Sequence, residues 1–152
     1  MTHPKEDLKS RVRSAFSTCT PPHEDELVED DWDASRIRAD FAPYLRATLP
    51  PAIVEAHANS LPALKPRAFL YFLRDYLLYG LDHIDSAVSE YLIFRLHELD
   101  WDEAYGRDRL SMFSKTQRDT VADCCEWFLD NSPDREMYIR KLLREAVVKW
   151  RA

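Results

Sequence analysis

The chain is almost without glycine: it holds two glycines and nine prolines in 152 residues. Sandwiches and barrels of strands need many tight turns, and glycine supplies the backbone conformations that those turns require. Proline instead marks breaks between helices, because a helix tolerates it only in its first turn. This composition predicts an all-α protein.

The segment 66–81 predicts the centre of the fold. It begins with Pro66 and is apolar around almost its whole circumference. A helix of this kind must be covered by neighbours on all sides. The chain has 152 residues, of which 45% are hydrophobic, and this is enough to bury one core of its own. We therefore expect residues 1–152 to form a single helical domain, a bundle built around this central helix.

Apolar residues spaced three or four apart predict the other helices, and about five long ones are expected in all. The long helices are expected over 4–17 and 66–81, after the turn 82–85 through Leu99, from the cap at Ser114 through Phe128, and from Ser132-Pro133 through Trp150. Shorter helical pieces are expected near 33–59, and the polar stretch 100–113 is expected to be a loop. Ser114 and Gln117 have the spacing of a capping box, in which each side chain accepts a backbone N–H at the start of a helix.

The acidity of the chain is concentrated in one segment. Residues 24–33 hold seven carboxylates, and without them the net charge of −6 would become +1. Such a surface attracts positively charged partners, and Trp32 could add an aromatic anchor. A solvated acidic loop is an equally open interpretation, and the pattern does not decide whether 20–33 is ordered. The predicted partner-binding residues are Glu24, Asp25, Glu26, Glu29, Asp30, Asp31, Trp32 and Asp33.

Bound metals and cofactors are not expected. The acidic segment lacks the ligand spacing and the turn glycine of a calcium loop. The histidines and cysteines show no zinc-binding spacing. Gly80 and Gly106 each stand alone, so the sequence has no glycine-rich loop for phosphate groups.

Two charged residues interrupt the central apolar helix. Buried charges are costly unless they are paired, so Arg74 and Asp75 should both have partners. Adjacent residues point apart on a helix, so we expect Asp75 to accept from Tyr71 or Tyr79, and Arg74 to reach an acid on another helix. A structural network is the favoured interpretation. The alternative is a cleft in which these four residues serve a small enzyme.

The histidines and cysteines provide weaker candidates for catalysis. His57, His83 and His97 could act as general bases, although ordinary turn or core roles are equally compatible with their positions. Cys124 and Cys125 are neighbours within a predicted helix, which favours core packing over a nucleophilic role.

Compartment and partner class follow from broader features. The N-terminus has no apolar signal core, no stretch approaches the about 20 apolar residues of a membrane span, and three cysteines are an odd number. We expect a cytoplasmic protein without membrane contact. The last helix is basic, but the pI of about 5.4 and the absence of recognised motifs argue against nucleic-acid binding.

Several short motifs carry a family resemblance over roughly residues 8–130. These motifs are Leu49-Pro50-Pro51, Ser60-Leu61-Pro62-Ala63-Leu64, the run from Pro66 through Tyr76, Ser89-Glu90-Tyr91-Leu92, the run from Phe113 through Arg118, and Trp127-Phe128-Leu129. The chain resembles an uncharacterised family of small bacterial proteins known only as a domain of unknown function. The resemblance implies an intact helical domain and transfers no catalytic residues. Members of that family often have proline at the position of Arg74, and some carry a cysteine pair near the acidic segment. This chain has only Cys19 in its N-terminal third, so a metal role does not carry over.

Three hypotheses about function follow. The favoured one is a protein-binding module without enzymatic activity, most concretely an immunity-type protein that neutralises a bacterial toxin by binding a basic surface. The second is the small enzyme with the central-helix cleft. The third is a homo-oligomeric scaffold, for example a homodimer formed through surfaces at Trp127 and Trp150.

Overall fold

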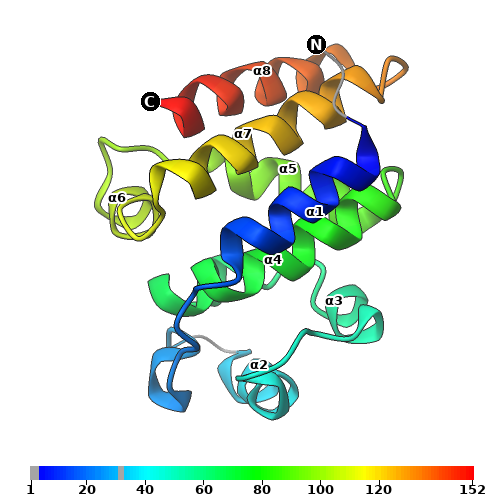
Figure 1. The fold of residues 1–152 in the computed structure, drawn as a ribbon. Coiled ribbons are helices and arrows are strands. Elements are labelled where there is room, and N and C mark those ends of the chain that lie inside the picture. The colour runs from blue at the N-terminus through cyan, green and yellow to red at the C-terminus, as the bar shows by residue number, and fades with distance from the viewer. Residues whose placement is uncertain (1–3, 31–32) are drawn as a thin grey trace.

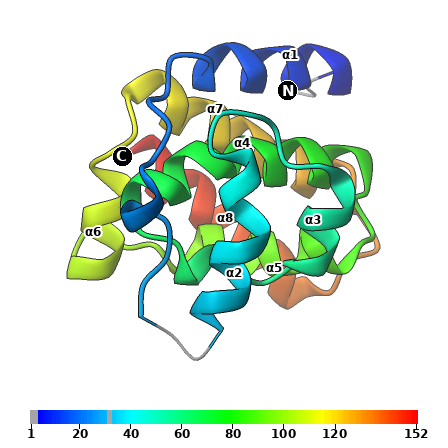
Figure 2. The same cartoon turned by 90° about the horizontal axis from the view of Figure 1, so that it is seen from below.

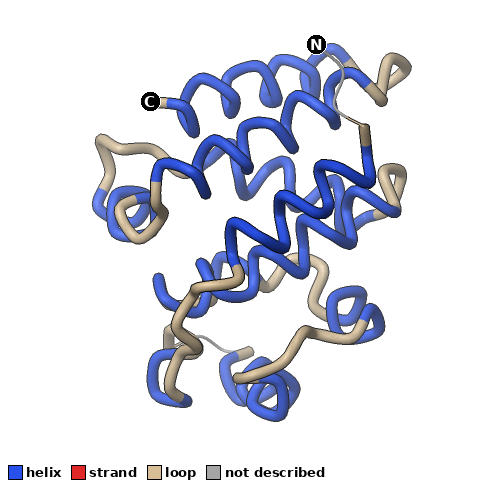
Figure 3. Tube along the Cα trace, in the orientation of Figure 1, coloured by secondary structure: helices blue, strands red, loops and turns tan. Residues whose placement is uncertain are grey.

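The fold is seen in a computed structural model that describes residues 4–30 and 33–152. Over these residues the protein is all-α, as predicted, and it contains no strand (Figure 3). The α-helices are α1 (Lys5–Phe16), α2 (Ala34–Phe41), α3 (Pro51–Ala56), α4 (Pro66–Asp82), α5 (Ala87–Glu98), α6 (Ala104–Leu110), α7 (Lys115–Asp130) and α8 (Met137–Arg151). Three short 3-10 helices connect them, namely η1 (Glu24–Glu26), η2 (Ala42–Tyr44) and η3 (Leu61–Ala63).

Helix α4 lies at the centre, as its apolar circumference predicts. Eleven of its 17 residues are buried. Helix α1 packs against α4 and α7, and α5 packs between α4 and α8 (Figure 1). Helices α2 and α3 cover the remaining side of α4, as the view from below shows (Figure 2). The result is one bundle with one continuous core.

One carboxylate joins the first, seventh and last helices. Asp123 in α7 accepts hydrogen bonds from Arg11 in α1 and from Arg151 in α8. Arg151 also pairs with Glu126 in α7. The Asp123 side chain is 11% exposed, whereas those of Arg11 and Arg151 are 45% and 37% exposed, so water screens these charges in part. The pairing fixes the two ends of the chain against α7.

The predicted loop 100–113 contains a helix, α6, so that part of the prediction is wrong. The polar composition misled because Arg109 is used inside the protein: it is 3% exposed and donates to the Leu64 carbonyl at 2.6 Å. Its guanidinium also lies 3.8 Å from the centre of the Tyr105 ring. The loop prediction assumed that the charged residues of this segment stay exposed, and the buried Arg109 does not.

Two other boundaries differ from the prediction. Helix α3 ends at Ala56 rather than near residue 60, because His57 leaves the helical conformation and turns its side chain into the core. Helix α8 begins at Met137 rather than at 133. The turn before it is held by Arg140, which donates to the carbonyls of Leu129 and Ser132.

The two surfaces predicted for a homodimer, at Trp127 and Trp150, are not exposed in the structure. Trp150 is completely buried and its indole N–H donates to the Leu96 carbonyl at 2.9 Å. Trp127 is 8% exposed. Their indoles serve the core of the single chain, so neither can form the surface that a homodimer would use. The hydrophobic periodicity correctly placed both tryptophans on helices. They lie on the buried faces of those helices and not on exposed ones.

Substitution of Gly106 by alanine should destabilise the protein by about 3 kcal/mol. A Cβ atom at this position would lie 2.4 Å from the backbone nitrogen and oxygen of Asp100, and backbone cannot easily move away. Gly80→Ala is the matched control. There the nearest atom, at 3.0 Å, is the far end of the Phe128 ring, and a gain in helix propensity of about 1 kcal/mol offsets the contact. Urea unfolding of both variants measures the difference, and equal losses would contradict the close approach of α6 to Asp100.

Candidate functional site

The acidic segment is anchored to the fold by two apolar residues within it. Leu27 and Val28 are buried, and Val28 forms a β-bridge with Leu64. The Glu29 N–H donates to the Ala63 carbonyl at 2.8 Å, and the Lys65 N–H donates to the Leu27 carbonyl at 3.2 Å. Residues 24–30 therefore have a fixed position beside the start of α4, and they are drawn in blue at the lower left of Figure 1.

Four acidic side chains of this segment face solvent. Glu24, Asp25, Glu29 and Asp30 are exposed, and we call these four residues the acidic ridge. Within the described part of the chain, Glu24, Asp25 and Asp30 have no side-chain hydrogen bond or ion pair. Glu29 has only a long ion pair, 4.0 Å from Arg109. The ridge thus presents carboxylates that the fold itself does not use.

Two of the predicted contact residues instead serve the fold. Glu26 accepts from the backbone N–H of His23 at 3.0 Å and from Arg67 at 3.2 Å. The His23 N–H and the Arg67 guanidinium lower the pKa of Glu26. Asp33 precedes α2 and pairs with Arg36 at 3.7 Å. The predicted residues Asp31 and Trp32 lie outside the described residues.

The predicted partners of the charged pair in α4 are wrong. The Arg74 Nε atom lies 3.5 Å from Asp75 Oδ1, although the two residues are adjacent. The long arginine side chain can fold back along the helix, which the argument from diverging Cα–Cβ directions overlooked. The hydroxyl of Tyr79 donates to Glu55 at 2.9 Å rather than to Asp75, and the Tyr71 ring lies 5.4 Å from the Arg74 guanidinium.

The Arg74–Asp75 pair is buried and poorly satisfied. Its separation of 3.5 Å is longer than an ordinary hydrogen bond. Arg74 Nε, Arg74 Nη2 and Asp75 Oδ2 are buried and have no hydrogen-bond partner within residues 4–30 and 33–152. Burial raises the pKa of Asp75, while the Arg74 charge and the Leu49 backbone N–H oppose that rise.

The four predicted cleft residues do not share one cleft. Asp75 and Tyr79 line a cavity of about 280 Å³ between α3 and α4. Arg74 and Tyr71 are not among the residues that line it, and Tyr71 is 6% exposed. This cavity therefore brings together two of the four predicted side chains, Asp75 and Tyr79.

A constellation that the sequence did not reveal joins Asp40, His57 and Ser60. His57 Nε2 lies 2.7 Å from Asp40 Oδ2, and Nδ1 lies 3.0 Å from Ser60 Oγ. These residue types also form hydrolytic triads, but the His57 side chain is 0% exposed and no substrate could reach it. The Tyr76 hydroxyl donates to the His57 carbonyl at 2.7 Å, and the Phe41 ring packs edge-on against the imidazole. The array therefore connects α2 and α3 to α4.

The other histidines have local roles. His97 Nε2 lies 2.9 Å from Glu145 and links α5 to α8. The exposed His83 ring packs beside Tyr79, with ring centres 4.3 Å apart. Among residues 4–30 and 33–152, no serine, threonine or cysteine side chain forms a hydrogen bond with either imidazole.

The thiols are core groups, as predicted. Cys124 and Cys125 are completely buried, and Cys19 is half-buried. Burial raises the pKa of all three, that of Cys125 to about 12. A thiol with a raised pKa contains little thiolate at neutral pH, and the thiolate is the nucleophile.

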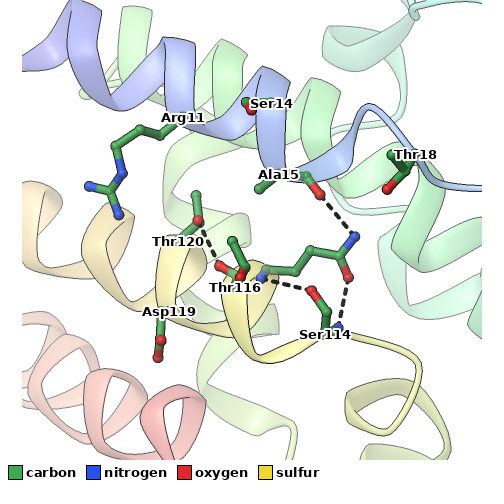
Figure 4. A pocket seen from close by; sticks show the side chains of 9 residues that line it. Arg11, Ser14, Ala15, Thr18, Ser114, Thr116, Asp119 and Thr120 are labelled. Atoms are coloured by element: carbon green, nitrogen blue, oxygen red, sulfur yellow. Dashed lines mark hydrogen bonds between the residues drawn. The ribbon is translucent and has the colours of Figure 1, made fainter.

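A second cavity, of about 550 Å³, lies between α1 and the start of α7 (Figure 4). Several of its polar groups have partners within the protein. Arg11 binds Asp123, Asp119 pairs with Lys115, and the Thr120 hydroxyl donates to the Thr116 carbonyl. The capping box at its edge is confirmed: the Gln117 N–H donates to the Ser114 hydroxyl, and the Ser114 N–H donates to the Gln117 side chain.

The basic residues of α8 are largely engaged by the protein. Lys149 donates to the His97 carbonyl at 2.8 Å, and Arg151 pairs with Asp123 and Glu126. Across residues 4–30 and 33–152, no group of three or more His, Cys, Asp or Glu residues could hold a metal ion. None of the helices in that part of the chain combines the length and the apolar character that crossing a bilayer requires.

The stability of the protein should fall with rising pH because of Asp75. Between the ordinary Asp pKa and the raised pKa of the folded state, the folded protein binds more protons than the unfolded chain. The free energy of unfolding therefore decreases as pH rises through this window. Asp75→Asn cannot titrate, so the stability of the wild type relative to this variant should decline as pH rises above the ordinary Asp pKa of about 3.9.

Urea unfolding at several pH values tests this expectation. Asp85→Asn, which removes a carboxylate from an exposed site just after α4, controls for net charge alone. A difference between the wild type and Asp75→Asn that stays constant with pH would contradict it.

The chain matches no protein-family model, and no curated protein or solved structure is significantly similar to it. The resemblance to the uncharacterised bacterial family thus remains an expectation from the sequence.

Proposed function

We propose that the protein is a binding module that docks a basic protein partner through the acidic ridge. The observation that carries this proposal is the exposure of Glu24, Asp25, Glu29 and Asp30 on a segment that is anchored from below by Leu27 and Val28. Carboxylates that the fold does not need, yet holds in place, are suited to pair with lysine and arginine side chains of another protein.

The anchoring also supports the proposal energetically. Binding by a disordered segment loses affinity to the entropy of ordering that segment. Two backbone hydrogen bonds, from Glu29 to Ala63 and from Lys65 to Leu27, already order the segment when the protein folds. Binding therefore loses less entropy to ordering it. A concentrated negative potential further accelerates the encounter with a positively charged surface, and salt weakens this effect.

The partner class that fits best is a basic bacterial toxin, with this protein as its immunity-type inhibitor in the cytoplasm. Direct inhibition by binding needs a stable fold and a complementary charged surface, and it needs no catalytic residues. The three free cysteines are compatible with a reducing compartment. This class rests on the family resemblance and on the charge of the ridge rather than on any contact with a partner.

Charge reversal of the ridge should abolish capture of the partner. The variant Glu24→Lys, Asp25→Lys, Asp30→Lys changes exposed side chains that have no side-chain ion pair or hydrogen bond within the described residues. Its helicity should therefore be unchanged, and the affinity should fall by about a hundredfold or more. The measurement is a tagged pull-down from the native cells at low and moderate salt, followed by titration calorimetry with the captured protein.

A matched control changes the same number of acids elsewhere. Asp85→Lys, Asp134→Lys, Glu136→Lys alters exposed residues in the α4–α5 and α7–α8 connections, and its net charge equals that of the ridge variant. It should retain the partner. If both triple variants lose the partner equally, net charge alone is responsible; if the ridge variant binds normally, the ridge is not the interface.

A further inference from the structure

The outer face of α8 carries an exposed row of side chains. Met137, Lys141, Arg144 and Val148 follow one another at intervals of four, three and four residues, so they lie on one side of the helix, opposite its buried face. Met137 is 82% exposed and Val148 is 71% exposed. We call these four residues the α8 stripe. It extends over about 16 Å along the helix axis.

The two cations of the α8 stripe are not used by the fold. Neither Lys141 nor Arg144 forms a hydrogen bond or an ion pair with another side chain within residues 4–30 and 33–152. Glu145, which follows Arg144, is bound by His97 at 2.9 Å. The His97 hydrogen bond, and to a smaller extent the Lys141 charge, lower the pKa of Glu145. The stripe therefore presents two positive charges to solvent on a chain whose net charge is −6.

An aromatic side chain extends the α8 stripe toward α5. Tyr138 is exposed, and its ring centre lies 6.5 Å from that of Phe94. Methionine, tyrosine and arginine are enriched at protein–protein interfaces, and adjoining exposed apolar side chains mark such surfaces, whereas isolated ones do not. The stripe thus has the composition of a docking surface for a protein that presents negative charge.

The acidic ridge is a surface of complementary composition on the same chain. Its Glu29 lies 4.0 Å from Arg109, and the Arg109 guanidinium lies 3.8 Å from the centre of the Tyr105 ring. Tyr105 is exposed, and its hydroxyl is held by the Pro62 carbonyl at 2.9 Å. Carboxylates therefore lie beside a fixed aromatic ring, just as the cations of the stripe lie beside apolar side chains.

The two surfaces lie at different ends of the molecule. In Figure 1, α8 runs along the top and residues 24–30 lie at the lower left. One chain cannot bring its own stripe to its own ridge, so a contact between them must join two copies. Because the two surfaces differ, such a contact is head-to-tail and leaves one surface free at each end of the assembly.

We propose that the α8 stripe of one copy docks on the acidic ridge of a second copy, so that the protein forms head-to-tail chains in solution. Lys141 and Arg144 pair with carboxylates of the ridge, and Met137 and Val148 exclude water around these pairs. An anionic membrane is a poorer occupant, because the net charge of −6 is repelled by it. The inference does not require the proposed function. If the ridge also docks a basic partner, that partner and the second copy compete for it.

Sedimentation velocity of the whole protein, over a wide range of concentration, tests this proposal. At low salt the average mass should rise with concentration and pass that of a dimer. At high salt the association should weaken, because salt screens the charges of the contact. A protein that stays monomeric at every concentration, or whose growth stops at a dimer, would overturn the proposal.

Neutral variants identify the two surfaces. Lys141→Gln, Arg144→Gln removes the charges of the stripe, and Glu24→Gln, Asp25→Asn, Asp30→Asn removes three charges of the ridge. All five side chains are exposed, so circular dichroism spectra should stay native. Each variant alone should associate about tenfold more weakly than the wild type or less. An equimolar mixture retains one intact stripe and one intact ridge, so it should form a heterodimer that grows no further.

The matched control is Lys5→Gln, Arg13→Gln, which removes two positive charges from exposed positions on α1. It should associate as the wild type does. Undiminished association of the stripe variant, or a mixture that contains only monomers, would contradict the assigned contact. Flotation with phosphatidylserine vesicles tests the membrane: binding by a protein that remains monomeric would reassign the stripe and overturn the proposal.

Failure of this inference and failure of the proposed function are separate outcomes. A monomeric wild type whose basic partner is lost on charge reversal of the ridge would overturn self-association alone. Chains that depend on the ridge, in a protein whose charge-reversed ridge variant still captures the same basic partner, would overturn the proposed function alone.

Discussion

Burial of α4 on every side is the constraint on which the rest of the structure depends. A helix with eleven buried residues out of 17 cannot lie at the edge of a domain. Helices α1, α5 and α7 pack on it from one side, and α2 and α3 cover it from the other. The covering helices need only one apolar stripe each. Their outer faces are therefore free to carry charged residues.

Polar groups inside this core show two different degrees of satisfaction. Asp123 accepts from two arginines on two helices, so its burial stabilises a particular arrangement of the ends of the chain. Arg74 and Asp75 are a single ion pair at 3.5 Å, and three of their buried atoms have no hydrogen-bond partner among residues 4–30 and 33–152. Folding alone would favour apolar residues of similar volume at these two positions.

The long helices could be predicted because stripes and caps are relations between neighbours in the sequence. Helix α6 could not, since Arg109 is charged and yet buried. The contact of Asp40 with His57 arises only from tertiary packing, and no spacing in the sequence indicates it. The acidic residues of 24–33 were evident from the sequence. Their fixed position depends on the buried residues Leu27 and Val28, which an argument based only on the charges of the segment did not consider.

The position of α1 has a consequence for synthesis of the protein on the ribosome. This helix is made first, but it packs against α7 as well as α4, and its Arg11 binds Asp123 of α7. Until residues 115–130 have emerged, a nascent chain cannot cover both sides of the apolar stripe formed by Leu8, Val12 and Phe16. The bundle can therefore close around α1 only after α7 has been made.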